Sequence, residues 1–292
     1  MVLAFDLGGS HISSALIDGD RRPQRIVSRY FGKEASADDL LQDITAAGLE
    51  AVGQEQIAGI SMAAPRPFDY ENGISLLEHK HRSLFGQNLR ILLAAAFGLE
   101  MSQVVFLHDA QAFLLGEIQF GQFDKGRRAV GVTLGTGVGS AFANCGAILD
   151  GGKGVPLHGE IYNLPWGAGI VEDKISTRAL CASYKLASGR ESNVKELASV
   201  AEADPEAMQV FREFGSNLGT ILDAVLRDFQ PEYLILGGAI SRSAHLFLPA
   251  FKASMRHIHP NILQSKLFQT ASLLGAADYW FSGPPRTVEA SF

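Results

Sequence analysis

The stretch that decides the fold is residues 2–18, VLAFDLGGSHISSALID. Its opening run, Val2 to Phe5, is a short apolar segment of the kind that forms a buried strand. The residues Asp6-Leu7-Gly8-Gly9-Ser10 follow as a turn, and His11 to Ile17 predicts a second strand. This part of the chain therefore predicts a β-hairpin with glycines at its tip.

Two later stretches repeat the pattern of a strand that ends in glycine. The run 129–134 predicts a strand that enters Gly135-Thr136-Gly137-Val138-Gly139, and 140–144 predicts the returning strand. A third predicted strand, 233–236, enters Gly237-Gly238. Such a turn presents several backbone N–H groups to one point, and the missing Cβ atoms let a phosphate approach closely. One loop is explained equally well by the positive φ that hairpins need, but three together favour anion binding.

Between the glycine loops, predicted strands alternate with predicted helices. Strands are expected at 25–30, 57–63 and 103–107, and helices at 37–52, 89–97, 175–186, 208–229 and 271–280. Neither GxxxxGK[ST] nor GxGxxG between a strand and a helix occurs in the sequence, so neither a P-loop nor a dinucleotide-binding loop is supported. The sequence predicts an α/β protein with another phosphate-binding architecture.

The composition excludes several classes of protein. The 292 residues, 47% hydrophobic and 19% charged, suffice for two domains or one large one. A net charge of -6 without a long basic block argues against nucleic acid as a partner. The two cysteines, Cys145 and Cys181, form neither a disulfide framework nor a metal-ligand cluster. Asp6 interrupts the first apolar run and no later run reaches the ~20 residues of a membrane helix, so we expect a soluble, cytoplasmic protein.

The order and spacing of the three glycine loops resemble the first phosphate, second phosphate and nucleoside loops of sugar kinases in the actin-like ATPase superfamily. Within it the chain is similar to the ROK family (repressor, open reading frame, kinase) from Leu3 to about Tyr279. The likeness is supported by Pro67-Phe68-Asp69 with Gly73, His108-Asp109-Ala110-Gln111 with Gly116-Glu117, Gly159-Glu160-Ile161, and Glu172 with Ser176. It implies the two-domain actin-like ATPase (ribonuclease H-like) fold, an α/β fold with an interdomain cleft.

The resemblance also implies domain bounds and nucleotide contacts. The N-terminal domain would hold residues 1–108 plus about 276–292, and the larger domain residues 109–275. Contacts to ATP and its phosphates are implied for Asp6, Gly8, Gly9, Ser10, Gly135, Thr136, Gly137, Gly237 and Gly238. Asp6 would hold Mg²⁺ through water, because that ion keeps much of its hydration shell. The alternative for Asp6 is an ordinary turn aspartate.

Asp109 is the candidate catalytic residue, since the matching aspartate of the family deprotonates the sugar hydroxyl. The alternative is that Asp109 only caps the helix after it, a common role for aspartate. Sugar contacts are implied for Lys80, His108, Asp109, Glu160, Asn163 and Glu172. Carboxylates suit this role because each can accept hydrogen bonds from two hydroxyls, although without the resemblance each glutamate would be taken for a surface residue.

The chain departs from the family pattern on the acceptor side. His108 and Lys80 stand where the family commonly has asparagines, and Pro65-Arg66 replaces a Pro-Gly pair. Asn163 replaces a histidine that touches both sugar and zinc, and the short segment 164–169 replaces the cysteine-rich zinc loop, so we predict no structural zinc. An unusual hexose, an amino sugar or a sugar acid stays open as acceptor. An exposed polar loop without a ligand role stays open for Lys80.

These features together predict a sugar kinase that transfers the γ-phosphoryl group of ATP to a hydroxyl of a hexose or hexose derivative. The 6-OH is the favoured acceptor, Asp109 the general base, and polyphosphate stays open as a second donor. The alternative is a catalytically weak sugar or nucleotide sensor without a DNA-binding domain. A family repressor is not expected, because the first phosphate loop at Asp6 leaves no room for an N-terminal helix-turn-helix. A homodimer is expected by analogy with the family.

Overall fold

The computed structural model describes residues 1–292 except 33–34, 79–80, 122, 284–287 and 291–292. The chain divides into two compact units, each with its own hydrophobic core. The first unit contains residues 1–122 and 267–285, and the second contains residues 123–266 and 286–292. The expected domain boundary after residue 108 lies inside the first of these units.

The first unit is built on a mixed five-stranded sheet with the order β3-β2-β1-β4-β7. Its strands are β1 (Val2–Leu7), β2 (His11–Ile17), β3 (Pro23–Tyr30), β4 (Gly59–Ala64) and β7 (Val104–His108). β1, β2 and β3 are antiparallel neighbours, whereas β4 and β7 run parallel to β1. A two-stranded hairpin, β5 (Phe68–Asp69) and β6 (Ile74–Ser75), follows β4.

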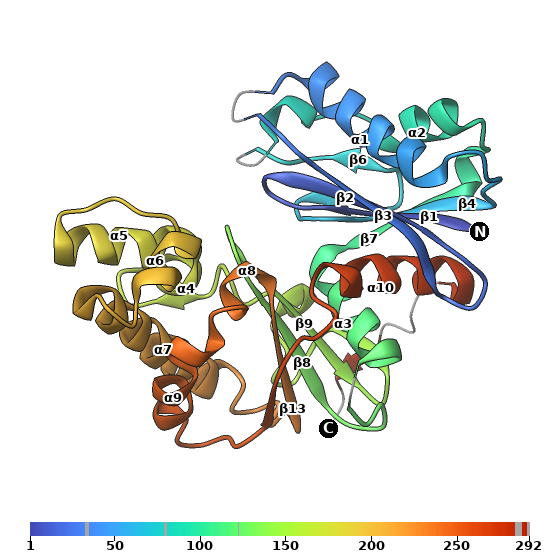
Figure 1. Cartoon of the computed structure of the whole chain (residues 1–292). Coiled ribbons are helices and arrows are strands. Elements are labelled where there is room, and N and C mark those ends of the chain that lie inside the picture. The colour runs from blue at the N-terminus through green and yellow to red at the C-terminus, as the bar shows by residue number, and fades with distance from the viewer. Residues whose placement is uncertain (33–34, 79–80, 122, 284–287, 291–292) are drawn as a thin grey trace. The chain divides into compact units, whose positions relative to one another are not determined.

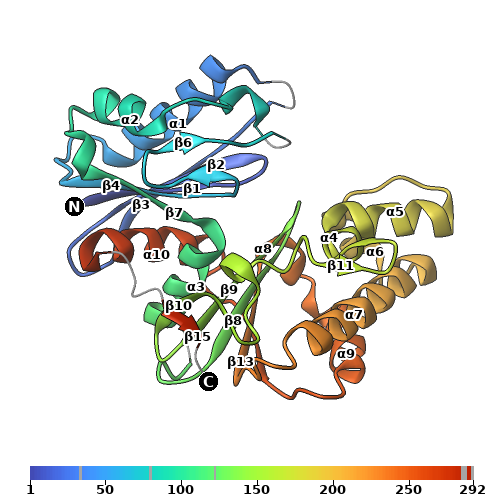
Figure 2. The same ribbon diagram turned by 180° about the vertical axis from the view of Figure 1, so that it is seen from behind.

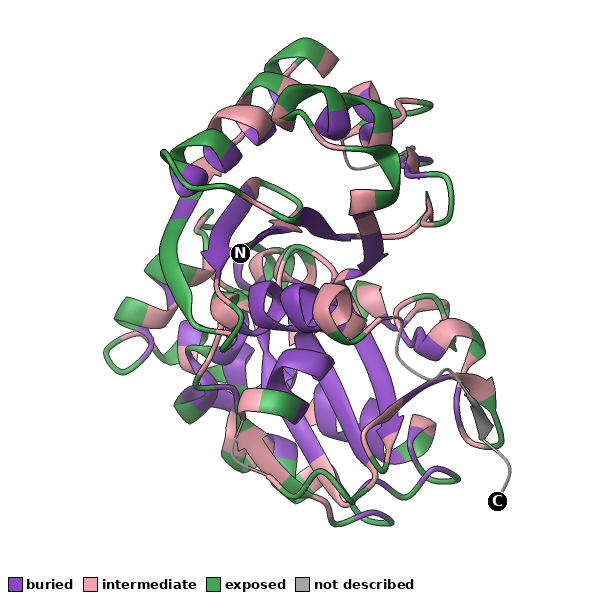
Figure 3. Cartoon of the chain, turned by 90° about the vertical axis from the view of Figure 1, so that its right-hand side faces the viewer, coloured by how far each residue is buried: buried purple, intermediate pink, exposed green. Residues whose placement is uncertain are grey.

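Helices cover both faces of this sheet, with α1 and α2 on one side and α10 on the other (Figures 1 and 2). α1 (Ala37–Val52) packs on β1, β2 and β3, and α2 (Leu89–Phe97) packs on β7. α10 (Gln269–Ser282) packs on β1, β2 and β4, and α3 (Asp109–Phe120) packs on α10. Two short 3-10 turns, η1 (Arg82–Leu84) and η2 (Met101–Gln103), lie in the connections. β1 and β4, in the middle of the sheet, are buried almost throughout (Figure 3).

The second unit repeats this strand arrangement in a six-stranded sheet with the order β14-β13-β8-β9-β10-β15. Its strands are β8 (Ala129–Leu134), β9 (Val138–Asn144), β10 (Ala147–Gly152), β13 (Tyr233–Gly237), β14 (Asn261–Gln264) and β15 (Val288–Ala290). β8, β9 and β10 are antiparallel, and β13 and β14 run parallel to β8. In this order β8, β9, β10, β13 and β14 take the places that β1, β2, β3, β4 and β7 have in the first sheet.

The helices of the second unit are α4 (Glu172–Ile175), α5 (Thr177–Ser188), α6 (Val194–Val200), α7 (Pro205–Val225), α8 (Gly238–Ser241) and α9 (Ala244–Ser254). Most of them gather around the long helix α7. α7 packs on α9 and α5, while α8 lies against β8. The connection from β10 to α4 contains the 3-10 turn η3 (Leu157–Gly159) and a small hairpin, β11 (Pro165–Trp166) and β12 (Gly169–Ile170).

The glycine-tipped hairpins and the strand before Gly237 are confirmed as predicted. The helix expected around 175–186 is α5, but it begins only at Thr177, because Ser176 has an extended backbone (φ -109°, ψ 170°) and separates it from α4. The Ser176 hydroxyl accepts a hydrogen bond from the Ala179 N–H and caps α5. The helix expected at 208–229 is α7, which begins at Pro205 after the capping residue Asp204 and ends at Val225.

α3 and α10 approach each other more closely than ordinary helices, and glycines make this possible. A Cβ on Gly116 would lie 2.0 Å from the Ala271 carbonyl oxygen, and one on Gly275 would lie 1.8 Å from the Ala112 carbonyl oxygen. Backbone therefore meets backbone at the crossing. The crossing also fixes two residues discussed below, since Asp109 begins α3 and Ser272 lies on α10.

We predict that Gly275→Ala destabilises the protein by about 2 kcal/mol or more, because the new methyl group has no space against the α3 backbone. Alanine for glycine inside a helix would otherwise stabilise by about 1 kcal/mol, so the crossing reverses the usual sign. The free energy of unfolding from chemical denaturation measures the effect.

The matched control is Gly19→Ala, since a Cβ on Gly19 has nothing within 4 Å. This variant is expected within about 0.5 kcal/mol of the parent protein. A Gly275→Ala protein as stable as this control would contradict the close crossing.

Candidate functional site

The carboxyl ends of β1, β4 and β7 form one edge of the first sheet. These three strands are parallel, with Asp6 paired to Ala63 and Ala64 paired to His108. Side chains that follow such strands collect at one edge, where α/β proteins commonly bind ligands. Asp6, near the end of β1, and Asp109, directly after β7, are both placed at this edge.

Asp6 is half-buried beside a second carboxylate. Burial removes water from its carboxyl, and the negative charge of Asp109 repels a charge on it. A hydrogen bond from the Ser272 hydroxyl acts in the opposite direction, but the two larger effects raise the pKa of Asp6 to about 7. Two neighbouring carboxylates that resist joint ionisation would be stabilised by a cation between or beside them.

This arrangement fits a magnesium ion held mainly by water and phosphate. Among the residues that the structure describes, no group of three or more His, Cys, Asp and Glu side chains could enclose a metal ion. Mg²⁺ in nucleotide sites commonly uses one or two carboxylates and completes its shell with waters and phosphate oxygens. At this edge Asp6 is the residue that would hold Mg²⁺, because its negative charge is unfavourable unless a cation compensates it.

Asp109 combines partial exposure with a fixed carboxylate. It is the first residue of α3, while His108 occupies the capping position without a side-chain capping bond. The Oδ1 atom of Asp109 accepts a hydrogen bond from the Ala110 N–H at 2.7 Å and lies 3.1 Å from Nε2 of His108. The Asp109 side chain is 34% exposed and that of His108 only 7%. The Asp109 side chain can therefore reach a ligand, whereas that of His108 lies beside it in the protein interior.

The first glycine loop connects β1 to β2. The Gly8 N–H donates to the His11 carbonyl at 2.9 Å, and the Gly8 carbonyl oxygen lies 2.8 Å from Nε2 of His81. A Cβ on Gly8 would lie 3.0 Å from the His11 ring, so the turn is tight on that side. Gly9 and Ser10 are exposed at the tip, where their backbone can face a ligand.

The second glycine loop, residues 135–137, connects β8 to β9 and is braced from α4 and α5. The Thr177 N–H donates to the Gly135 carbonyl at 2.9 Å, and Oε2 of Glu172 accepts from the Val138 N–H at 2.9 Å. A Cβ on Gly135 would meet nothing within 4 Å, and the backbone there is not left-handed. The folded chain therefore does not require glycine at position 135 for packing or for its backbone conformation. This favours another reason for glycine there, namely that the missing side chain lets a ligand contact the backbone.

Gly238, in the third loop, is glycine for a structural reason. It has a φ of +80°, and a Cβ on it would lie 2.3 Å from the Leu134 carbonyl oxygen at the end of β8. Gly237 pairs with Thr133 across the parallel strands β13 and β8. The second and third glycine loops therefore lie side by side at the carboxyl edge of the second sheet.

The expected sugar-binding residues of the second unit differ in their surroundings. Glu160 is almost buried, and the Ser140 hydroxyl braces the backbone on both sides of it, donating to the Gly159 carbonyl at 2.5 Å and accepting from the Ile161 N–H at 3.0 Å. Asn163 is exposed, and Glu172 is half-buried. Lys80 lies outside the described residues.

The segment expected in place of a zinc loop forms the β11–β12 hairpin, with Gly167 in a left-handed conformation (φ 61°). The absence of structural zinc stays a prediction. Three residues that support the site were not anticipated from the sequence, namely Ser140, Thr177 and Ser272. Each acts through hydrogen bonds with a distant part of the chain, so no local pattern marks it.

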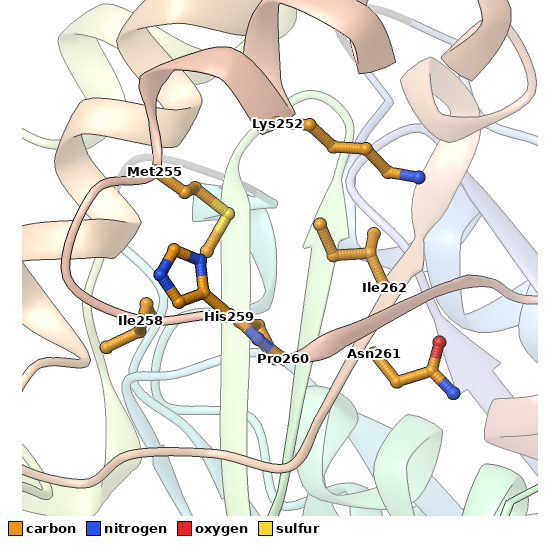
Figure 4. A pocket seen from close by; sticks show the side chains of 7 residues that line it. All are labelled: Lys252, Met255, Ile258, His259, Pro260, Asn261 and Ile262. Carbon is orange, nitrogen blue, oxygen red and sulfur yellow. The ribbon is translucent and has the colours of Figure 1, made fainter.

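The second unit also contains a cavity of about 290 Å³ (Figure 4). It is lined by Lys252, Met255, Ile258, His259, Pro260, Asn261 and Ile262. Asn261 begins β14 and pairs with Tyr233 at the start of β13, so the cavity lies at the amino edge of these strands. The glycine loops lie at the carboxyl edge.

Comparison with known proteins gives one family for nearly the whole chain. The model of the ROK family matches residues 2–282. The glucokinase of Thermotoga maritima is 28% identical, and the match covers 94% of this chain and 96% of the relative. The N-acetyl-D-glucosamine kinase of Yersinia enterocolitica is 24% identical, covering 95% of this chain and 98% of the relative.

A solved structure gives the same fold. The ROK family glucokinase from Streptomyces griseus, in complex with glucose and AMPPNP, has a TM-score of 0.80 and 24% identity. The match covers 97% of this chain and 99% of that one. The predicted fold class, the α/β fold of actin-like ATPases and sugar kinases, is thereby confirmed.

The sequence also led to expectations about a membrane, a homodimer, the cellular location and nucleic acid. In the part of the chain that the structure describes, we find no helix with the length and apolar character needed to cross a membrane. The homodimer, the cytoplasmic location and the exclusion of nucleic acid as a partner stay predictions.

The raised pKa of Asp6 makes the stability of the metal-free protein depend on pH. Because folding raises the pKa of this carboxyl from 3.8 to about 7, the folded state binds its proton more tightly than the unfolded state. The tighter proton binding therefore stabilises the folded protein fully below about pH 4, and this contribution to the free energy of unfolding is lost as the pH rises through about 7. We predict that Asp6→Asn, which removes this ionisation, is more stable than the parent protein by about 2 kcal/mol at about pH 8.

Chemical denaturation in the presence of a chelator, at about pH 5 and about pH 8, measures the difference between the two proteins. The advantage of Asp6→Asn should be smaller at the lower pH, where the carboxyl of the parent protein is protonated in the folded state. An advantage that does not grow with pH would show that Asp6 ionises normally.

Proposed function

Because the chain belongs to the ROK family, we propose that it is an ATP-dependent sugar kinase that phosphorylates a hydroxyl of a hexose or hexose derivative. The observation that carries the proposal is Asp109, a partly exposed carboxylate at the carboxyl edge of three parallel strands with one oxygen held by the Ala110 N–H. Relatives named glucokinase and N-acetyl-D-glucosamine kinase support a hexose-type acceptor.

Asp109 is the proposed general base. Its carboxylate accepts the proton of the acceptor hydroxyl while the hydroxyl oxygen forms a bond to the γ-phosphorus of ATP. The bond between the γ-phosphorus and the bridging oxygen breaks, and ADP leaves with the electron pair. The products are the sugar phosphate and ADP, and Asp109 then releases the proton to solvent.

The glycine loops are the proposed nucleotide contacts. Backbone N–H groups of Gly9 and Ser10 in one unit, and of Thr136 and Gly137 in the other, would donate to phosphate oxygens. Gly8 and Gly135, whose own N–H groups bond within their turns, would leave space for the phosphates to approach. Gly237 and Gly238 would flank the nucleoside. When bound with the nucleotide, Mg²⁺ neutralises phosphate charge, and Asp6 would hold it through water.

The proposed acceptor contacts are Glu160, Glu172, Asn163 and Lys80, with the 6-OH as the favoured acceptor. Glu160 suits this role because the Ser140 hydroxyl fixes the backbone before and after it. One oxygen of Glu172 already accepts the Val138 N–H, so this residue would link the second glycine loop to the sugar. Asn163 is exposed and supplies an amide that can donate to and accept from hydroxyls.

A pair of glycine substitutions separates nucleotide binding from folding. We predict that Gly135→Ala folds normally, because its Cβ enters open space, but raises the KM for ATP about tenfold or more by obstructing phosphate at the backbone. Gly238→Ala should instead lose about 2 kcal/mol or more of stability, because its methyl group meets the Leu134 backbone at a positive φ.

Thermal unfolding and ATP titration of both variants give the two readouts. If Gly135→Ala binds ATP as tightly as the parent protein, the second loop is not a phosphate loop. If Gly238→Ala is as stable as the parent protein, the contact between the third loop and β8 is weaker than its geometry implies.

The proposed base is tested with Asp109→Asn, which preserves size but cannot accept a proton at neutral pH. We predict a decrease in kcat of about 10²- to 10⁴-fold with little change in the KM for ATP. ADP release is measured with ATP and Mg²⁺ across hexoses, amino sugars, N-acetylated sugars and sugar acids, with polyphosphate as a second donor. Undiminished activity of the variant would contradict the assignment. A folded parent protein that binds nucleotide without turnover of any sugar would indicate the sensor instead.

A further inference from the structure

The first glycine loop, residues 8–10, is held from outside its hairpin by two hydrogen bonds. The Phe31 N–H donates to the Ser10 carbonyl at 2.9 Å, and Nε2 of His81 forms a hydrogen bond of 2.8 Å with the Gly8 carbonyl oxygen. Phe31 follows β3, and His81 precedes the 3-10 turn η1. Both partners belong to the same compact unit as the loop, so this unit braces the loop at its two ends.

The hydrogen in the contact between His81 and Gly8 belongs to Nε2. A carbonyl oxygen only accepts hydrogen bonds, so an imidazole nitrogen that bonds to it must carry the hydrogen. The tautomer with hydrogen on Nδ1 alone would set two acceptors against each other. We therefore assign Nε2 of His81 as the donor and the Gly8 carbonyl as the acceptor.

Packing and backbone contacts fix the position of the His81 ring. The ring meets that of Phe31 edge to face, with 5.0 Å between the centroids. The His81 backbone is left-handed (φ 49°, ψ 42°), and its carbonyl accepts from the N–H of the buried Leu84 at 2.8 Å. Phe31 thus contacts both the loop and the residue that holds it. The donor at Nε2 is therefore already in place in the folded chain.

The bond to the Gly8 carbonyl also sets the direction of the Gly9 N–H. These two groups belong to one trans peptide unit, in which the C=O and N–H bonds point in opposite directions. With a glycine on each side, such a unit reverses at little cost unless a contact from outside the loop fixes it. Reversal would turn the carbonyl oxygen, instead of the N–H, toward a bound phosphate. The contact from His81 opposes this reversal.

Gly9 is placed so that its N–H can serve a ligand. It is exposed, and within the described part of the chain its N–H donates to no backbone carbonyl. We propose that His81 is a positioning residue for the first phosphate loop, whose Nε2–H holds the Gly8 carbonyl so that the Gly9 N–H faces a phosphate group of ATP. This inference rests on the proposed function. It assigns His81 to the nucleotide, although its neighbour in sequence, Lys80, is an expected sugar contact.

Three substitutions of His81 separate the hydrogen bond from its surroundings. His81→Gln keeps the donor, since the amide nitrogen of glutamine is separated from Cα by the same number of bonds as Nε2. His81→Asn suits the left-handed backbone, which asparagine adopts readily, but its amide is too short to reach the Gly8 carbonyl. His81→Phe keeps an aromatic ring against Phe31 and has no donor.

We expect His81→Asn and His81→Phe to weaken the binding of the ATP analogue AMPPNP about 5- to 30-fold. The KM for ATP should rise by a similar factor, while the KM for the sugar changes less than about threefold. His81→Gln should bind AMPPNP within about threefold of the parent protein, although glutamine suits a left-handed backbone less well than asparagine. Isothermal titration calorimetry and steady-state kinetics give these values, and thermal unfolding shows that each variant is folded.

Parent-like affinity for AMPPNP in folded His81→Asn or His81→Phe would overturn the inference. A folded His81→Gln protein that binds AMPPNP more than about tenfold more weakly than the parent would overturn it as well, because the donor would then not be what matters. A raised sugar KM at unchanged AMPPNP affinity would assign His81 to the acceptor instead. If His81→Asn does not fold, His81→Phe decides.

Failure of the proposed function gives a different result. A parent protein that binds no AMPPNP would contradict the proposed function and this inference with it. A parent protein that binds AMPPNP but phosphorylates no sugar would contradict the kinase activity alone, and the AMPPNP affinities of the variants would still decide the role of His81.

Discussion

Burial of the Asp6 carboxyl beside Asp109 is the constraint on which the rest of the site depends. The parallel arrangement of β1, β4 and β7 places both carboxyls at one edge. Burial has the largest effect on the pKa of Asp6, and the negative charge of Asp109 has the second largest. The pKa of Asp6 near 7 is the result. The hydrogen bond from the Ser272 hydroxyl offsets these two effects only in part. Under the proposed function, Mg²⁺ bound with the nucleotide would compensate the negative charge.

The elements that carry these carboxyls are fixed by contacts remote from the chemistry. Asp109 begins α3, and Ser272, whose hydroxyl bonds to Asp6, lies on α10. The two helices cross at Gly116 and Gly275 with backbone against backbone, which restricts both the distance and the angle between them. In the second unit, the same strand order places two glycine loops at one sheet edge, and Thr177 and Glu172 brace the first of them, residues 135–137. One topology thus carries two carboxylates in the first unit and two glycine loops in the second.

Much of the fold could be predicted because its signals are local. The apolar run before Asp6 and the glycines after it specify strand and turn within a few residues, and the same holds at Leu134 and Leu236. The division of α4 from α5 could not be predicted from apolar spacing, because a single capping serine interrupts an otherwise helical pattern.

The candidate site was predictable in composition but not in its contacts. The positions of Asp6 and Asp109 at strand ends followed from the sequence. The hydrogen bond from Ser272 to Asp6 did not, because Ser272 lies on a helix near the other end of the chain. Glycine itself was ambiguous, because Gly238 is required by packing and Gly135 is not. His108 was expected to meet the sugar, and only the structure shows its imidazole buried against Asp109.

The most direct test of the central claim is ³¹P NMR of the purified protein incubated with ATP, Mg²⁺ and a single hexose or hexose derivative. The account predicts a new phosphomonoester resonance that requires the sugar and grows in equal amount to ADP, and its coupling identifies the phosphorylated hydroxyl. Consumption of ATP that yields only ADP and inorganic phosphate, with every sugar tried, would contradict it.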